Sequence, residues 1–193
     1  MKKIGITGGI GSGKSTVMDY ISSQGYPVYC SDIRAKELML QPTIIQEIQQ
    51  IFDENVIENH QLDRKKIASI VFQNPEKLQQ LNNIVHPAVE RDFMEFCQTH
   101  QDKDFVFYES ALMIETGNYQ QFDKVILVTA PLETRIQRVM QRDSLSKKEI
   151  EKRIANQLSD EEKRKFIDFE IVNQEKSETF KQIEEILKIL KSM

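Results

Sequence analysis

The feature that most constrains the fold is a glycine-rich segment near the N-terminus, Gly8-Gly9-Ile10-Gly11-Ser12-Gly13-Lys14-Ser15. It matches the pattern G-x-x-x-x-G-K-[S/T] in full, after an apolar, strand-like segment (4–7) and before a segment with helical spacing (14–24). Glycines are needed because the loop turns so tightly that backbone N–H groups point inward, where side chains would block phosphate oxygens. The segment predicts a phosphate-binding loop (P-loop) rather than an ordinary glycine turn.

Two polar residues complete this P-loop. The Lys14 ammonium supplies a positive charge for the β- and γ-phosphates of ATP, and the Ser15 hydroxyl can bind Mg²⁺. The positive N-terminal end of the following helix adds to the attraction. We expect ATP to bind with Mg²⁺ as cofactor on Gly11, Ser12, Gly13, Lys14, Ser15 and Thr16.

Further along the chain, strand-like and helix-like segments alternate. Alternation of this kind predicts an α/β fold with a parallel sheet covered by helices on both faces, a three-layer α/β/α arrangement. The expected strands are 4–7, 27–30, 105–108, 125–129 and 169–172. The expected helices include 14–24, 33–40 (capped by Ser31 or Asp32), 64–72 (capped by Asp63), one opening at Pro75, one after Pro131, and 179–190. The stretch as far as about residue 100 is helical in pattern, with an interruption at Pro87.

Acidic residues follow two of the expected strands. Ligands of open parallel sheets bind beyond the carboxyl ends of the strands, so Asp32 and Glu109 should share a cleft with the P-loop. Asp32 is either a carboxylate that orients and deprotonates an acceptor hydroxyl or a helix N-cap. Glu109 either faces Mg²⁺, through water, or is an exposed carboxylate at a strand end.

Other candidates are basic side chains. Arg138 and Arg142 lie four apart on one helical face, with Arg135 one turn earlier. They either stabilise charge on a transferred phosphoryl group or form a solvated face with ion pairs, one of them to Asp143. His86, before Pro87, is either a substrate contact or a packed histidine.

Charge and length limit the class of protein. The 193 residues suit one domain, and the net charge of −4 argues against a protein that coats nucleic acid or anionic membrane. No apolar run approaches the roughly 20 residues needed to cross a bilayer. We expect a cytoplasmic enzyme, monomeric or a small homo-oligomer, with no nucleic-acid or membrane partner.

Segments along nearly the whole chain also resemble one known family, the dephospho-CoA kinases. The resemblance begins with the doubled glycine in the P-loop segment 4–16. It continues in register through Ser31-Asp32, Leu81-Asn82-Asn83-Ile84-Val85-His86-Pro87, Leu112-Met113-Ile114-Glu115-Thr116-Gly117, Phe122-Asp123-Lys124-Val125 and Arg138-Val139-Met140-Gln141-Arg142-Asp143, with Gln157, Asp168 and Asn173 beyond.

The resemblance implies transfer of the ATP γ-phosphoryl group to the ribose 3′-hydroxyl of dephospho-CoA. It implies one P-loop kinase domain over residues 1–193, with five parallel strands as in nucleoside monophosphate kinases. Within that domain, residues 33–100 would bind the acceptor and residues from about 142 to 157 would form a lid. The site residues implied are Lys14, Asp32 and Arg142 for catalysis; Arg138, Arg142 and Asn173 beside the P-loop for ATP; Asp32, His86 and Leu112 for the acceptor; and Ser15 and Glu109 for the metal.

The chain departs from the family pattern at two acidic positions. Cys30-Ser31-Asp32 stands where the family usually has Asp-Ala-Asp, and Glu109 stands where it usually has Asp. A kinase of another small acceptor, such as a nucleoside monophosphate, would share the same P-loop and arginines. A guanine-nucleotide switch would need an Asn-Lys-x-Asp motif, which is absent from this sequence.

Overall fold

A computed structural model describes residues 1–143 and 145–193. The chain divides into two compact units: residues 1–30 together with 100–193 form the first, and residues 31–99 form the second. Ser144, inside the expected lid, lies outside the described residues.

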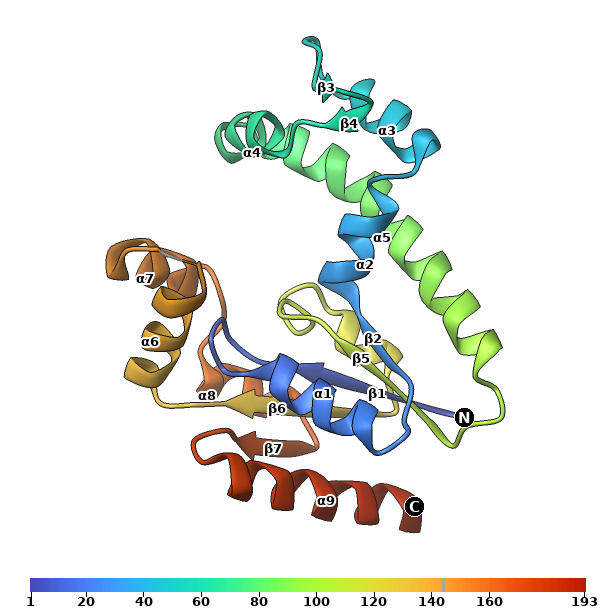
Figure 1. The fold of residues 1–193 in the computed structure, drawn as a ribbon, viewed down its shortest axis with the longest axis vertical. Coiled ribbons are helices and arrows are strands. Elements are labelled where there is room, and N and C mark those ends of the chain that lie inside the picture. The colour runs from blue at the N-terminus through green and yellow to red at the C-terminus, as the bar shows by residue number, and fades with distance from the viewer. Residues whose placement is uncertain (144) are drawn as a thin grey trace. The chain divides into compact units, whose positions relative to one another are not determined.

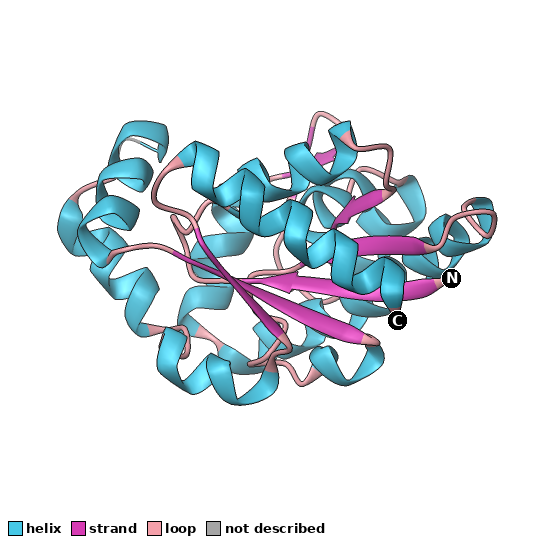
Figure 2. Cartoon of the chain, turned by 90° about the horizontal axis from the view of Figure 1, so that it is seen from below, coloured by secondary structure: helices cyan, strands magenta, loops and turns pink. Residues whose placement is uncertain are grey.

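The first unit contains a five-stranded sheet in the order β2-β5-β1-β6-β7 (Figure 1). Its strands are β1 (Lys2–Thr7), β2 (Val28–Cys30), β5 (Phe105–Glu109), β6 (Lys124–Thr129) and β7 (Phe169–Val172). Every neighbouring pair is parallel, and Figure 2 shows how the strands twist relative to one another. The predicted α/β fold with five parallel strands is confirmed.

Helices cover this sheet because its strands are apolar on both faces. Helices α1 (Lys14–Ser23) and α9 (Lys176–Ser192) pack against each other, α1 also against β5 and α9 against β7. Gly5, in the middle of β1, leaves room for Met113 and Phe122, whose atoms would lie within 3.2 Å of an added Cβ. The other helical elements are α6 (Leu132–Asp143), α7 (Lys147–Ala155), α8 (Asp160–Lys163), and the 3₁₀ helices η1 (Asn118–Gln121) and η2 (Arg164–Phe166).

The core of the first unit lies between these helices and the strands. Burial of this apolar surface is the main term that stabilises the sheet and fixes the position of the P-loop after β1. Its buried residues are Ile4, Ile6, Val17, Met18, Ile21, Phe105, Phe107, Ile126, Val128, Ile171, Ile183, Ile186, Leu187 and Leu190.

The second unit is mostly helical. Its helices are α2 (Ser31–Leu38), α3 (Pro42–Gln49), α4 (Arg64–Gln73) and α5 (Pro75–Thr99). Asp63 caps α4 by accepting a hydrogen bond from the N–H of Lys66 (3.0 Å), as predicted. Helix α2 begins at Ser31, so Ser31 and Asp32 lie in its first turn and not in front of it.

The expected helical pattern up to about residue 100 did not include a hairpin that the structure contains. Strands β3 (Ile57–Glu58) and β4 (Gln61–Leu62) form an antiparallel hairpin. Asn59 and His60 form its turn with φ values of 48° and 62°. Two successive positive φ values are typical of the type I′ turn that best joins two twisted strands. The strands are too short to produce an alternating sequence pattern, which explains the omission.

The expected interruption at Pro87 was wrong, because α5 runs unbroken from Pro75 to Thr99. Proline removes one N–H group and so leaves the carbonyl of Asn83, four residues earlier, without its helical donor. Asn83 and Pro87 are both exposed, where water can satisfy that carbonyl. The opposite side of the helix buries Val89 and Phe93, and this packing holds the helix together.

Candidate active site

The P-loop joins β1 to α1, as its sequence predicts (Figure 1). Gly11 and Gly13 have φ values of 78° and 91°, in the left-handed region that favours glycine. Gly13 is the N-cap of α1, which has no side-chain cap and no acidic residue in its first turn. By contrast, Ser146 and Ser159 cap α7 and α8 with their side chains. No side chain therefore caps the N-terminal end of α1, an end that favours an anion.

Lys14 lies across this loop. Its ammonium donates a hydrogen bond to the carbonyl of Gly8 (2.9 Å) and lies 3.5 Å from Glu109 Oε1. The sheet register explains the second contact, since Ile6 of β1 pairs with Glu109 at the end of β5. Each of the two charged side chains is only 12% exposed. The sequence prediction that Glu109 lies beside the P-loop is therefore consistent with this geometry.

Arg138 and Asn173 lie against the P-loop backbone. The Arg138 guanidinium donates to the carbonyls of Ser12 (3.3 Å) and Asn173 (3.1 Å), and the Asn173 amide donates to the Ser12 carbonyl (2.8 Å). Thr179 donates its hydroxyl proton to Asn173 Oδ1 and so orients the amide. A Cβ on Gly13 would overlap the Asn173 amide nitrogen. Both side chains thus support the loop, and their contacts with ATP stay predictions.

Arg142 lies one turn beyond Arg138, in the last turn of α6. It forms the ion pair with Asp143 that the sequence allowed (2.7 Å), and its side chain is 63% exposed. The hydrogen bond to Asp143 raises the pKa of Arg142 above its ordinary value. Its predicted part in catalysis depends on a bound nucleotide and stays a prediction.

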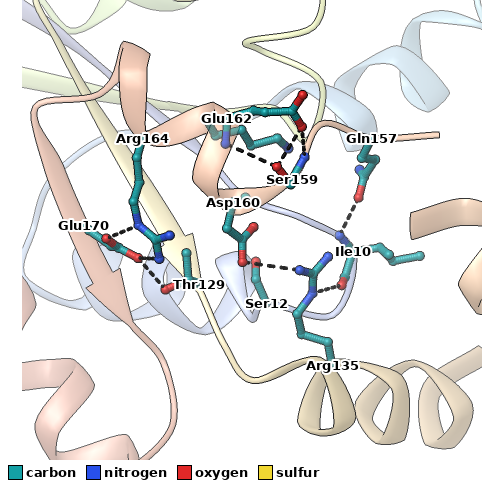
Figure 3. Close-up of polar contacts among 12 residues, drawn as sticks. Ile10, Ser12, Thr129, Arg135, Gln157, Ser159, Asp160, Glu162, Arg164 and Glu170 are labelled. Carbon is teal, nitrogen blue, oxygen red and sulfur yellow. Dashed lines mark hydrogen bonds and ion pairs between the residues drawn. The ribbon is translucent and has the colours of Figure 1, made fainter. Parts of the chain in front are cut away.

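Two further side chains, Gln157 and Arg135, contact the P-loop backbone, and Asp160 supports one of them (Figure 3). The sequence did not predict these contacts with the loop backbone. The Ile10 N–H donates to Gln157 Oε1 (2.9 Å), and the Arg135 Nε–H donates to the Ile10 carbonyl (2.9 Å). Asp160 pairs with Arg135 at 3.4 Å. Arg135 is only 7% exposed. Its position one turn before Arg138 was the only sequence signal, and it did not distinguish a buried arginine from a solvated one.

The expected acceptor residues belong to different units. Asp32, in the first turn of α2, and His86, within α5, are exposed residues of the second unit. Leu112 belongs to the first unit, shortly after β5, and is 44% exposed. Their contacts with an acceptor stay predictions.

The expected metal residues suit one ion in particular. Ser15 is exposed in the first turn of α1, and Glu109 ends the neighbouring strand β5. No group of three or more His, Cys, Asp or Glu side chains that could hold a metal occurs among residues 1–143 and 145–193. Mg²⁺ is usually bound by one or two side chains together with waters and substrate phosphates, so a hydroxyl and a carboxylate beside the P-loop fit it.

In the part of the chain that the structure describes, no helix is both long and apolar enough to span a bilayer.

Comparison with known proteins identifies the family. The family model for dephospho-CoA kinase matches residues 2–179. A dephospho-CoA kinase of Bacteroides fragilis is 37% identical over 189 residues, which cover 97% of this chain and 92% of the relative. The crystal structure of TT1252 from Thermus thermophilus superposes with a TM-score of 0.90 at 37% identity, covering 97% of this chain and 96% of the other.

A more distant structure shows how general the fold is. Shikimate kinase from Acinetobacter baumannii has a TM-score of 0.56 at 18% identity, covering 100% of this chain and 94% of the other, which shows the P-loop kinase fold alone. Because the family model and the Bacteroides relative both span nearly the whole chain, the protein belongs to the dephospho-CoA kinase family.

Proposed function

We propose that this chain transfers the γ-phosphoryl group of ATP to the ribose 3′-hydroxyl of dephospho-CoA, giving CoA and ADP. The observation that carries the proposal is the P-loop. Its helix α1 has an uncapped N-terminus, and Lys14 lies across it within reach of Glu109. The family to which the chain belongs supplies the acceptor.

On the ATP side, the backbone N–H groups from Gly11 to Thr16 bind phosphate oxygens. The Lys14 ammonium exchanges its contact with the Gly8 carbonyl for the β- and γ-phosphates, which carry far more negative charge. Arg138 and Asn173 hold the loop in the required shape from its other side. Such preorganisation means that little has to move when charge develops on the transferred group.

Ser15 and Glu109 would hold Mg²⁺, Glu109 through water. The ion would neutralise charge on the phosphates during transfer. Loss of activity on adding EDTA, with recovery on adding Mg²⁺, tests this part of the proposal.

On the acceptor side, the region 33–100, with His86, and Leu112 from the first unit bind dephospho-CoA. Asp32 orients the 3′-hydroxyl and takes its proton as the oxygen bonds to the γ-phosphorus and the bond to the β-phosphate oxygen breaks. The lid, residues from about 142 to 157, closes to exclude water, and Arg142 stabilises the transferring charge. All these parts act as one kinase domain of 193 residues, in the cytoplasm where ATP is available, as a monomer or a small homo-oligomer.

The test is direct. Purified protein is incubated with ATP, Mg²⁺ and dephospho-CoA, and CoA and ADP are quantified by mass spectrometry. Equal amounts of both products support the proposal, and parallel reactions with AMP or other nucleoside monophosphates should leave ATP intact. ADP formation with AMP but not with dephospho-CoA would overturn the assigned acceptor.

A further inference from the structure

One short segment, residues 157–163, contacts the P-loop at Ile10, and we call it the brace. Gln157 at its start accepts a hydrogen bond from the Ile10 N–H (2.9 Å). Asp160 pairs with Arg135, whose Nε–H donates to the Ile10 carbonyl (2.9 Å). The backbone N–H of Ile10 therefore bonds to the brace directly, and its backbone carbonyl bonds to the brace's ion-pair partner Arg135 (Figure 3).

Arg135 has little freedom between the brace and the loop. A Cβ on Gly9 would overlap its guanidinium, and a Cβ on Gly11 would lie 2.5 Å from its carbonyl oxygen. The guanidinium and backbone of Arg135 thus fill the space that two loop glycines leave open. A shift of Asp160 moves Arg135, and with it the P-loop backbone.

An ion pair between a buried lysine and a partly buried glutamate anchors the brace. Lys163, at its end, is fully buried, and its ammonium lies 3.0 Å from Glu115 Oε1. The same oxygen accepts a hydrogen bond from the Leu158 N–H (3.0 Å), so Glu115 holds both the start and the end of the brace.

The two charges of this pair depend on each other. Neither Lys163 Nζ nor Glu115 Oε2 has a hydrogen-bond partner among the described residues, so their mutual attraction is the main compensation for burial. Removal of one partner would leave the other charge without its ion pair. The brace would then be destabilised, because the remaining charge is more stable in contact with water. Structural support alone would not need a charge here, since an apolar pair of similar volume is often as stable.

We propose that Glu115 and Lys163 are positioning residues for nucleotide binding, which act on the P-loop through the brace. The ion pair and hydrogen bond recorded for them among the described residues run to each other and to the Leu158 N–H, not to the P-loop. Their effect is to fix Gln157 and Asp160, and through these the backbone N–H and carbonyl of Ile10, before ATP arrives. The inference rests on the proposed binding of the nucleotide to the P-loop and not on the identity of the acceptor.

The test measures nucleotide affinity in the full chain. Lys163→Met and Glu115→Gln are compared with the wild type by calorimetric titration with Mg-ADP, at a temperature where circular dichroism shows each variant folded. We expect about 10-fold weaker ADP binding in each, the usual size when support of a site is removed. Lys165→Met is the matched control, because Lys165 is an exposed lysine two residues away, and it should bind ADP like the wild type.

The double variant Glu115→Gln/Lys163→Met separates positioning from general damage, and it remains informative if a single variant does not fold. It removes both charges, while the glutamine oxygen still accepts from the Leu158 N–H. We expect it to recover most of the lost ADP affinity. If the double variant loses as much ADP affinity as the two single variants lose together, the proposal is overturned.

Two other measurements would change only if loss of the ion pair alters the P-loop. In the single variants, KM for ATP should rise about as much as the ADP dissociation constant, while KM for dephospho-CoA stays within about twofold. Hydrogen exchange of peptides covering Gly8–Ser15 should become faster. Folded single variants with wild-type ADP affinity and wild-type exchange would overturn the proposal. Wild-type protein that binds no ADP would instead overturn the proposed function.

Discussion

Replacing Gly11 by alanine should damage the P-loop by an amount that the structure allows us to estimate. At φ 78° an L-residue costs about 1–2 kcal/mol, partly offset by about 0.4–1 kcal/mol from the reduced freedom of the unfolded chain. The new Cβ would also lie 2.5 Å from the Arg135 carbonyl oxygen, and relief of such an overlap typically costs about 1–3 kcal/mol. We expect a total loss of about 2–4 kcal/mol.

Gly25→Ala is the matched control. Gly25 lies in the same unit with φ 84°, and an added Cβ there meets no atom within 4 Å. The free energy of unfolding of Gly25→Ala should fall only because alanine is disfavoured at positive φ, by about 1 kcal/mol or less. For a chain of this size 1 kcal/mol shifts Tm by about 2–4 °C. Thermal unfolding followed by circular dichroism should show a fall of about 3 °C for Gly25→Ala and roughly 10 °C for Gly11→Ala.

The two variants should differ more in activity than in stability. The overlap at Gly11 can be relieved only by moving the loop away from α6, and displacement of binding groups by about 1 Å can cost about 10²-fold in rate. Gly25→Ala should keep wild-type kcat/KM for ATP. Equal Tm shifts in the two variants, together with unchanged kcat/KM in Gly11→Ala, would show that contact with Arg135 does not fix the loop.

Further variants test individual side chains. Lys14→Ala should lower kcat/KM for ATP by about 10²–10³-fold without loss of the fold, and near-normal activity would refute the assigned role of the P-loop lysine. Asp32→Asn should reduce kcat by about 10²–10⁴-fold with little change in ATP affinity, whereas the reverse pattern would indicate a metal-binding or structural role. Arg142→Ala should lower kcat and leave Tm unchanged because the side chain is 63% exposed; unchanged kinetics would make it a plain surface residue. The hydrogen bond from Arg164 lowers the pKa of Glu170, so its stabilisation is complete above the ordinary pKa of about 4.3 and is lost as pH falls through the lowered pKa. The Tm difference between wild type and Glu170→Gln should therefore be constant from pH 7 to about 5 and shrink below about pH 4, and a difference as large at pH 3 as at pH 7 would contradict this.

The sequence predicted the features that depend on local chemistry. The glycines and Lys14 of the P-loop specify a phosphate site whatever surrounds them, and the apolar runs specify buried parallel strands. Asp63 caps α4 as expected, because capping involves only neighbours three residues apart.

The features that the sequence did not reveal depend on contacts between distant segments. Pro87 stays inside α5 because tertiary packing of Val89 and Phe93 outweighs one lost hydrogen bond. Lys163 stands beside Arg164 and Lys165 in the sequence, yet it is fully buried because Glu115, far away in sequence, lies beside it. A charged residue need not be exposed when its ion-pair partner comes from a distant segment of the chain.

The chain leaves the sheet at β2 and returns to it at β5, and these two strands are neighbours in the sheet. The second unit, residues 31–99, is thus an insertion whose two ends are tied to adjacent strands. Because the two strands are parallel, the insertion starts at the carboxyl end of β2 and returns through residues 100–104 to the amino end of β5. Its length and content can change without altering the pairing of the host strands. Evolution could therefore exchange this whole module while the nucleotide-binding half stays the same.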